Sequence, residues 1–182
     1  MRRLTNLEHL LLGLLHLKPA SGYALRKTFA STPLGHYSDS PGSIYPALNR
    51  LRRRGLVRPA KDQPATGRGT VLVSLTANGL AELRSWLGRS VTLEEVRSDA
   101  DGVMLRFVLS AQVFGQARAR RLVVQLAARA KEIVGDLESY LSGPGKTLPV
   151  AGRLAVEQGL AGYRALASWA ARAGRELKRS SS

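Results

Sequence analysis

Apolar residues recur every three or four positions near the start of the chain, which is the spacing of one face of an α-helix. The apolar positions are Leu7, Leu10, Leu11, Leu14 and Leu15. Thr5 or Asn6 can cap the start of such a helix. Pro19 cannot continue it, so the pattern predicts a helix over residues 6–17. Ser21 is a further capping residue and predicts a short second helix.

A third helical pattern lies between Ser40 and Gly55. Ser40 has the side chain of an N-cap, and Pro41 suits the first helical position, where no N–H is needed. Gly55 favours the left-handed conformation that commonly follows a helix end. The apolar stripe consists of Ile44, Leu48 and Leu51. Because this is the only apolar face of the helix, we expect it to pack inward against the first two helices.

Two short extended runs follow the third helix. They are residues 56–59 and the β-branched, apolar residues 70–75, with a Pro-, Gly- and charge-rich stretch between them. Two such runs around a loop predict a β-hairpin. Thr76 can cap a fourth helix. The predicted buried row of that helix is Leu80, Leu83 and Leu87. This order of elements is that of a winged helix-turn-helix domain, which we place at residues 1–90.

The second half of the chain has only helical patterns. Residues 92–95 form a capping box, residues 103–109 an apolar helical segment, and residues 117–141 a long periodic helix. Residues 150–178 predict a last helix whose apolar positions alternate in steps of four and three, as in a coiled-coil seam. The seam is Val156, Leu160, Tyr163, Ala167, Ala170, Gly174 and Leu177, with Trp169 beside it. We expect a second copy of the chain to cover this seam, so residues 91–182 are predicted to be a helical dimerisation domain.

The predicted fold class is therefore mainly α with a small β-hairpin, and charge indicates the kind of partner. The 182 residues include 28 Lys plus Arg against 13 Asp plus Glu, a formal charge of +15. Residues 1–90 hold 14 basic and 4 acidic side chains, whereas residues 91–182 hold 14 and 9. The field around such a protein favours polyanions, so nucleic acid and anionic membrane are the leading partners.

The third helix is the predicted DNA-contacting element, because its outward residues are small or hydrogen-bonding near its start and basic near its end. The residues expected to reach base edges or phosphates are Ser43, Tyr45 and Asn49. Those expected to neutralise phosphates are Arg50, Arg52 and Arg53. Further candidate contacts are Ser40, Pro46, Lys61 and Arg68. The alternative, that the arginines only complement the helix dipole, is the one we assign to Arg54.

Several blocks in the first 90 residues closely resemble the PadR family of bacterial transcriptional regulators. They are L-E-H-L-L-L-G-L-L from residue 7, S-G-Y-A-L from residue 21, G-S-I-Y-P-A-L from residue 42 and L-T-A-x-G from residue 75. The resemblance implies a winged-helix repressor that dimerises through C-terminal helices and binds an operator with dyad symmetry. The chain departs from the family in its wing, where residues 70–73 lack the usual basic side chains and the charge lies earlier, at Lys61 and Arg68.

The resemblance also implies varied ligands, among them phenolic acids and flat hydrophobic drugs that stack on a tryptophan. Trp86, Met104 and Phe107 are the candidate lining of a cavity for a small hydrophobic or aromatic effector, placed between the DNA-binding domain and the dimerisation helices. Core packing is the alternative for both tryptophans of the chain. For Trp169 we expect a place at the dimer interface.

No enzyme, cofactor or metal site is predicted. Residues 143–147 suggest a phosphate-binding loop, but the first glycine of that motif would fall at Tyr140, and a helix precedes it instead of a strand. The histidines, His9, His16 and His36, lack the spacing of metal ligands. The absence of cysteine agrees with a reducing cytoplasm, and no window approaches the about 18 apolar residues of a membrane span.

The sequence therefore favours a cytoplasmic, homodimeric regulator that binds double-stranded DNA. One alternative is a basic protein-interaction module without specific DNA readout. Another is a peripheral binder of anionic membrane. The membrane alternative is the weakest, because the third helix has no bulky apolar residue left to insert once its apolar stripe is buried.

Overall fold

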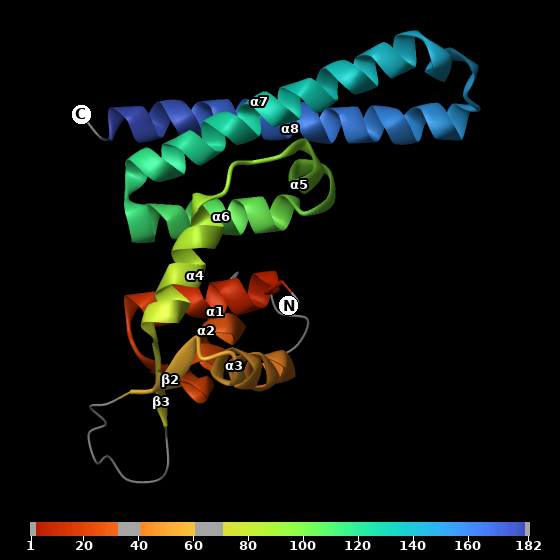
Figure 1. Cartoon of the computed structure of the whole chain (residues 1–182). Coiled ribbons are helices and arrows are strands. Elements are labelled where there is room, and N and C mark those ends of the chain that lie inside the picture. The colour runs from red at the N-terminus through yellow and green to blue at the C-terminus, as the bar shows by residue number, and fades with distance from the viewer. Residues whose placement is uncertain (1–2, 33–40, 61–70, 181–182) are drawn as a thin grey trace. The chain divides into compact units, whose positions relative to one another are not determined.

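A computed structural model describes residues 3–32, 41–60 and 71–180. The chain divides into two compact units, Met1–Arg89 and Ser90–Ser182 (Figure 1). The described elements of the first unit are α1 (Asn6–Leu17), β1 (Ala20–Ser21), α2 (Gly22–Ser31), the 3-10 turn η2 (Pro41–Ser43), α3 (Ile44–Arg53), β2 (Val57–Pro59), β3 (Leu72–Leu75) and α4 (Ala77–Gly88). Those of the second unit are α5 (Leu93–Ser98), α6 (Ala100–Phe114), α7 (Gln116–Ser142), the 3-10 turn η3 (Pro144–Thr147) and α8 (Val150–Arg179). The predicted fold class, mainly α with a small β element, is confirmed.

Capping side chains set the starts of most helices. Thr5 Oγ1 accepts a bond from the backbone N–H of Glu8 at 3.2 Å, and the Glu8 carboxylate accepts one from the N–H of Thr5 at 2.9 Å. This capping box satisfies two N–H groups that the first turn of α1 would otherwise leave without partners. Ser21 caps α2, Thr76 caps α4, and Thr92 forms a second capping box at α5. These helix starts are the ones that the sequence predicts.

The start of α3 differs from the prediction, whereas its end agrees with it. A 3-10 turn precedes the α-helix, which begins at Ile44, and Ser43 stands before it without a side-chain cap bond. Ser40, the predicted N-cap, lies outside the described residues. Gly55 follows the helix with φ of +68°, the left-handed conformation that a glycine adopts without strain. The chain therefore turns from α3 into β2 at the predicted residue.

The sheet of the first unit has β3 at its centre, paired antiparallel with β1 on one side and β2 on the other. The pairing of β2 with β3, which places Pro59 opposite Val73, is the predicted hairpin. The strand β1 was not predicted. It has two residues, Ala20 and Ser21, and so short a strand shows no alternation of side chains that a sequence pattern could reveal.

The core of the first unit forms where α1 meets α3 and α4. Leu10, Leu11 and Leu12 of α1 are at most 1% exposed. The predicted stripe of α3 is buried as well, and α3 packs against both α1 and α2. In the predicted row of α4, Leu83 and Leu87 are fully buried, whereas Leu80 is half-buried. The inner side of α3 is thus held firmly, which fixes the direction of its outer side.

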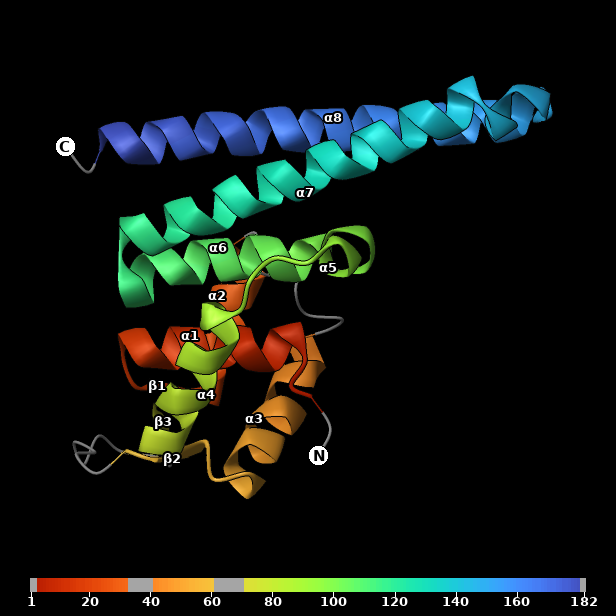
Figure 2. The ribbon, with the colours of Figure 1, turned by 45° about the horizontal axis from the view of Figure 1, so that its top comes forward.

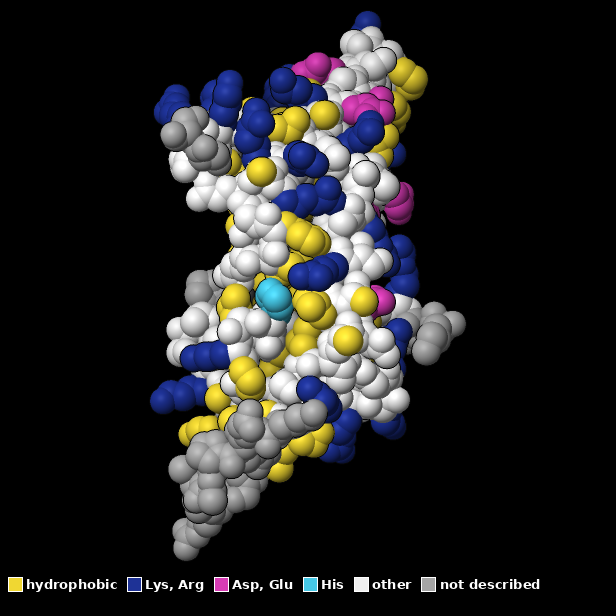
Figure 3. Space-filling view, turned by 60° about the vertical axis from the view of Figure 1, so that its left-hand side comes forward, with side chains coloured by type: hydrophobic (Ala, Val, Ile, Leu, Met, Phe, Trp, Pro, Cys, Tyr) yellow, Lys and Arg dark blue, Asp and Glu magenta, His cyan; other side chains and the backbone are white. Residues whose placement is uncertain are grey.

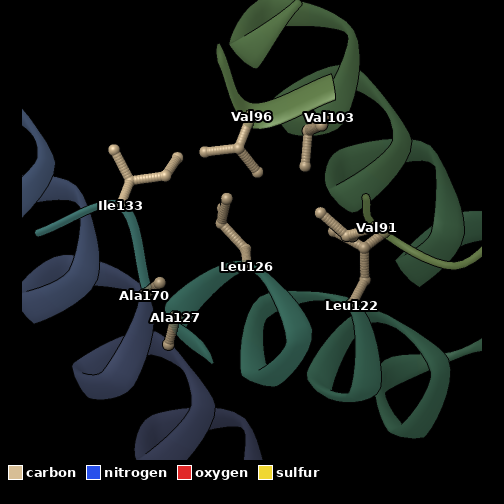
Figure 4. Packing of buried hydrophobic residues seen from close by; sticks show 8 residues of the cluster. All are labelled: Val91, Val96, Val103, Leu122, Leu126, Ala127, Ile133 and Ala170. Carbon is tan, nitrogen blue, oxygen red and sulfur yellow. The ribbon is translucent and has the colours of Figure 1, made fainter. Parts of the chain in front are cut away.

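The core of the second unit forms where α7 meets α5, α6 and α8. Figure 4 shows the eight buried members of this cluster, Val91, Val96, Val103, Leu122, Leu126, Ala127, Ile133 and Ala170.

In the described ranges, no helix is both long and apolar enough to cross a bilayer.

The seam of α8 is covered by a helix of the same chain, which corrects one prediction. α8 runs back along α7 (Figure 2). Four seam residues are buried, namely Leu160, Ala167, Ala170 and Gly174, and the others, Val156, Tyr163 and Leu177, are half-buried. The expectation that a second copy covers this stripe is therefore wrong for its buried members. The spacing showed that the stripe needs a helical partner, but it could not show which helix that is.

Candidate nucleic-acid interface

The outward side of α3 gathers most of the described candidate contacts. Its exposed residues are Tyr45, Pro46, Asn49, Arg52 and Arg53. Four of them, with Arg50, line one open hollow. Since the opposite face of α3 is locked in the core, these side chains keep a common direction. A helix that presents amide, hydroxyl and guanidinium groups on one exposed side has the chemistry to contact base edges and phosphates.

Arg50 differs from the other arginines of α3. Its Nε donates to Oε1 of Glu8 at 2.6 Å, and the Glu8 side chain is only 2% exposed. A carboxylate buried to this extent requires a cation or hydrogen-bond donors beside it. Arg50 thus ties α3 to the start of α1. We interpret it as a residue that positions α3, and not mainly as the phosphate contact that the sequence predicted.

Asn49 and Arg52 form a pair on the exposed side of α3. Nη2 of Arg52 lies 3.3 Å from Oδ1 of Asn49. This bond orients the Asn49 amide, and an oriented amide is the group that pairs with the edge of adenine in the major groove. One turn apart, α3 therefore presents an amide whose chemistry suits a base edge and a guanidinium that binds this amide.

Tyr45 rests against the start of α2. A Cβ added at Gly22 would lie 2.6 Å from Cε1 of Tyr45, so the ring occupies the space that any other residue at position 22 would need. Tyr45 nevertheless remains 46% exposed. The position of its phenol group on the outward side therefore depends on a glycine in the neighbouring helix.

Replacing Gly22 with alanine is expected to move the Tyr45 ring and weaken DNA binding several-fold while the domain stays folded. The contact is with the outer edge of a side chain that can rotate, so the displacement should cost little stability. Affinity measured by fluorescence anisotropy, together with the melting temperature, checks this. A control is Gly159→Ala, since a Cβ at Gly159 meets nothing within 4 Å. If Gly22→Ala and Gly159→Ala bind DNA equally well, Tyr45 has no role in the interface.

A small pocket of about 180 Å³ opens between α3 and the sheet. Its lining residues from α3 include Tyr45, Asn49 and Arg52, and its strand residues include Arg58 and Pro59. Arg58 is exposed on β2 and was not among the predicted contacts. Arg58 could have been found from the alternation of inward and outward side chains along a strand. Val57 is buried, so the side chain of Arg58, which follows it, must point outward.

Three predicted contacts, Ser40, Lys61 and Arg68, lie outside the described residues. Ser43 is described and is half-buried at the end of the turn before α3. It therefore stands at the entrance of the helix and not on its exposed side.

The candidate effector residues each have packing contacts within their own unit. Trp86 is 7% exposed and stacks on His9, with ring centroids 4.1 Å apart and an angle of 10° between the rings. Met104 and Phe107 pack against the core cluster of the second unit, and the Phe107 ring meets Trp169 edge-to-face at 5.8 Å. These contacts agree with the core-packing alternative for both tryptophans. Among the described residues, no three His, Cys, Asp or Glu side chains gather as a metal site would require.

Comparison with known proteins assigns the first unit to a family. The sequence matches the transcriptional regulator PadR-like family over residues 11–85, and no curated protein matches it. Among solved structures, Bacillus subtilis PadR in complex with operator DNA is similar, with 22% identity over 94% of this chain and 98% of that one, and a TM-score of 0.43. The same protein in complex with p-coumaric acid shares 20% identity over 98% of each chain, with a TM-score of 0.43. The Vibrio cholerae virulence activator AphA shares 22% identity over 95% of this chain and 98% of that one, with a TM-score of 0.41.

The assignment rests on the family match, because the structural similarities have TM-scores below 0.5. The matched residues run from within α1 to within α4 and include every described strand and the whole of α3. Proteins of this family are transcriptional regulators and not enzymes, as the sequence predicts. The chain therefore carries, in residues 11–85, the domain of the transcriptional regulator PadR-like family.

Proposed function

We propose that this protein is a sequence-specific regulator that binds double-stranded DNA through α3. The observation that carries the proposal is the outward side of α3, where Tyr45, Asn49 and Arg53 are exposed on a helix whose other side is locked in the core of a PadR-like domain. In a winged helix, the helix that follows the turn enters the major groove with its first residues toward the bases. Asn49 then reads bases, while Arg53 and Arg52 contact phosphates.

We further propose that the protein acts as a homodimer on an operator with dyad symmetry. Two copies of α3 would then enter successive major grooves about 34 Å apart. Because α7 covers the buried part of the α8 seam, the contact between copies would use apolar residues that the single chain leaves exposed. Val150 and Leu154 at the start of α8 are such residues, at 65% and 53% exposure. Repression follows if the occupied operator overlaps a promoter.

A small hydrophobic or aromatic effector that releases the DNA remains part of the proposal. Trp86 is the residue to monitor, because its indole ring would report a ligand that displaces it from His9. A change in tryptophan fluorescence upon addition of planar aromatic acids, absent in Trp86→Phe, would support such an effector. Identical titration curves for the two proteins would exclude a role for Trp86.

Two substitutions on α3 are expected to have different effects on DNA binding. Asn49→Ala should relax the preference at one position of the operator, with a loss of about 1–3 kcal/mol against the preferred base. Arg53→Ala should weaken binding to all sequences about equally and lower the salt slope of the affinity by about one, because one phosphate contact is lost. Binding to an operator and to its single-base variants, at several salt concentrations, measures both effects. If the two variants changed the base preference and the salt slope to the same extent, the proposal that Asn49 reads a base and Arg53 contacts a phosphate would be contradicted.

A further inference from the structure

The end of the α7–α8 hairpin that lies away from the η3 turn brings two distant parts of the sequence together. Nε of Arg120, near the start of α7, donates to the carbonyl oxygen of Gly174, near the end of α8, at 3.3 Å. A Cβ added at Gly174 would lie 3.4 Å from Cγ2 of Val124, so the two helices are in close contact there. The first turns of α7 and the last turns of α8 therefore form one surface (Figures 1 and 2).

This surface carries a strong excess of positive charge. Within residues 116–128 and 165–179, the cations are Arg118, Arg120, Arg121, Arg172, Arg175, Lys178 and Arg179. The single carboxylate of these two stretches is Glu176. We call this surface the basic end. Figure 3 shows dark blue side chains gathered over it at the upper left, whereas magenta side chains appear farther along the hairpin, toward the upper right.

The rest of the same hairpin is balanced in charge. Residues 129–141 and 150–164 hold four cations, Arg129, Lys131, Arg153 and Arg164, and four carboxylates, Glu132, Asp136, Glu138 and Glu157. Three of these arginines form ion pairs, with N–O distances of 2.8 Å for Arg129–Glu132, 3.2 Å for Arg153–Glu157 and 2.6 Å for Arg164–Glu138. The hairpin is thus able to form and to present a charged surface to water without an excess of cations.

The excess at the basic end is unfavourable for folding. Arg118, Arg120 and Arg121 lie in the first two turns of α7, where the helix dipole is positive and cations are disfavoured. Arg172 and Arg175 lie one turn apart on α8, where like charges repel. Complementing the dipole at the end of α8 accounts for Lys178 and Arg179, and the bond to Gly174 accounts for Arg120, but neither accounts for Arg121. A polyanion bound at this surface would offset the unfavourable dipole at the start of α7 and the repulsion between Arg172 and Arg175.

We propose that the basic end is a second DNA-binding surface, which contacts the phosphate backbone without reading bases. The inference rests on the proposed function, because duplex DNA is the polyanion that α3 would bind. Six of the seven cations are arginines, whose planar guanidinium group suits phosphate oxygens. Contacts of this kind add affinity that is independent of sequence and falls with salt.

A charge-matched pair of variants of the full chain tests the proposal. The test variant carries Arg121→Gln, Arg172→Gln and Arg175→Gln, and the control carries Arg129→Gln, Arg153→Gln and Arg164→Gln. All six side chains are exposed, and both variants lose three charges. The affinity for a 40-base-pair duplex of random sequence is measured over a series of salt concentrations. The slope of log K against log salt should shrink by about two to three in the test variant, at about 0.9 per lost phosphate contact, and should stay unchanged in the control.

The outcomes separate this inference from the proposed function. Equal slopes for the test and control variants overturn the inference alone. A wild type that binds no duplex contradicts the proposed function and the inference with it. If the test variant loses binding to phosphatidylserine vesicles or to single-stranded RNA but not to duplex, the basic end serves another polyanion and the inference is wrong. If the triple variant does not fold, the single variants Arg172→Gln and Arg153→Gln are compared in the same way. The slope of log K against log salt should then shrink by about one in Arg172→Gln and stay unchanged in Arg153→Gln.

Discussion

Arg50→Met is expected to lower the free energy of unfolding by about 2–3 kcal/mol, whereas Arg53→Met, one turn farther along α3, should change it by less than about 0.5 kcal/mol. The reason is Glu8, whose carboxylate is 2% exposed and accepts from Nε of Arg50 at 2.6 Å. Removing the guanidinium takes from a buried carboxylate the cation that it contacts at 2.6 Å. Arg53 is exposed, so its loss should reduce DNA affinity without destabilising the fold.

Urea unfolding of the two variants and of Glu8→Gln measures this difference. A double-mutant cycle with Glu8→Gln and Arg50→Met should give a coupling energy of about 1 kcal/mol or more, as for residues in direct contact. If Arg50→Met proved as stable as Arg53→Met, the Glu8–Arg50 ion pair would not hold α3 in place. Arg50 would then again be counted among the residues expected to contact phosphates.

The stability of the protein is expected to fall as the pH decreases from about 6.5 to about 4, because His9 is buried. Burial lowers the pKa of His9 from 6.5 to about 4, although the backbone oxygen of Thr5, 3.1 Å from Nδ1, acts in the opposite direction. Between these two values the unfolded chain binds a proton that the folded chain does not. Protonation therefore favours unfolding, by about 3 kcal/mol at the lower end of the window.

His9→Phe removes this titration while leaving an aromatic ring to stack on Trp86. Nε2 of His9 is buried, has no hydrogen-bond partner among the described residues and lies 3.8 Å from Oε1 of Glu82, so the change removes no hydrogen bond of that nitrogen. The contact of Nδ1 with the oxygen of Thr5 is lost at every pH of the comparison. Unfolding free energies of the wild type and His9→Phe, measured from pH 7 to pH 4, should diverge steadily, with the wild type losing about 3 kcal/mol more. Parallel curves would mean that His9 titrates equally in the folded and unfolded states.

Local signals made the helices of this chain predictable from its sequence. A capping side chain acts on N–H groups two or three residues away, so Thr5, Ser21, Thr76 and Thr92 mark helix starts within a few letters of sequence. The left-handed turn at Gly55 is local in the same sense. The stripe of α3 was predictable too, because one apolar face on a short helix leaves only one direction of packing.

Contacts between distant residues were not predictable. Glu8 and Arg50 are 42 residues apart, and nothing near either one shows that they pair. For the same reason the sequence could not show that α7 covers the buried part of the α8 seam, since a seam defines the shape of its partner and not its identity. The missed strand β1 depends on pairing with β3, about 50 positions later, and not on a pattern of its own.

The central claim is that α3 reads a DNA sequence, and competition binding of the full chain tests it most directly. Duplexes are first enriched by binding from a random pool, and the affinity for the enriched duplex is then compared with that for random duplex at the same salt concentration. We predict a preference of at least about a thousandfold, which Asn49→Ala should lower by about 5- to 150-fold, the equivalent of its expected loss of about 1–3 kcal/mol. Equal affinity for both duplexes, from low salt upward, would contradict the claim.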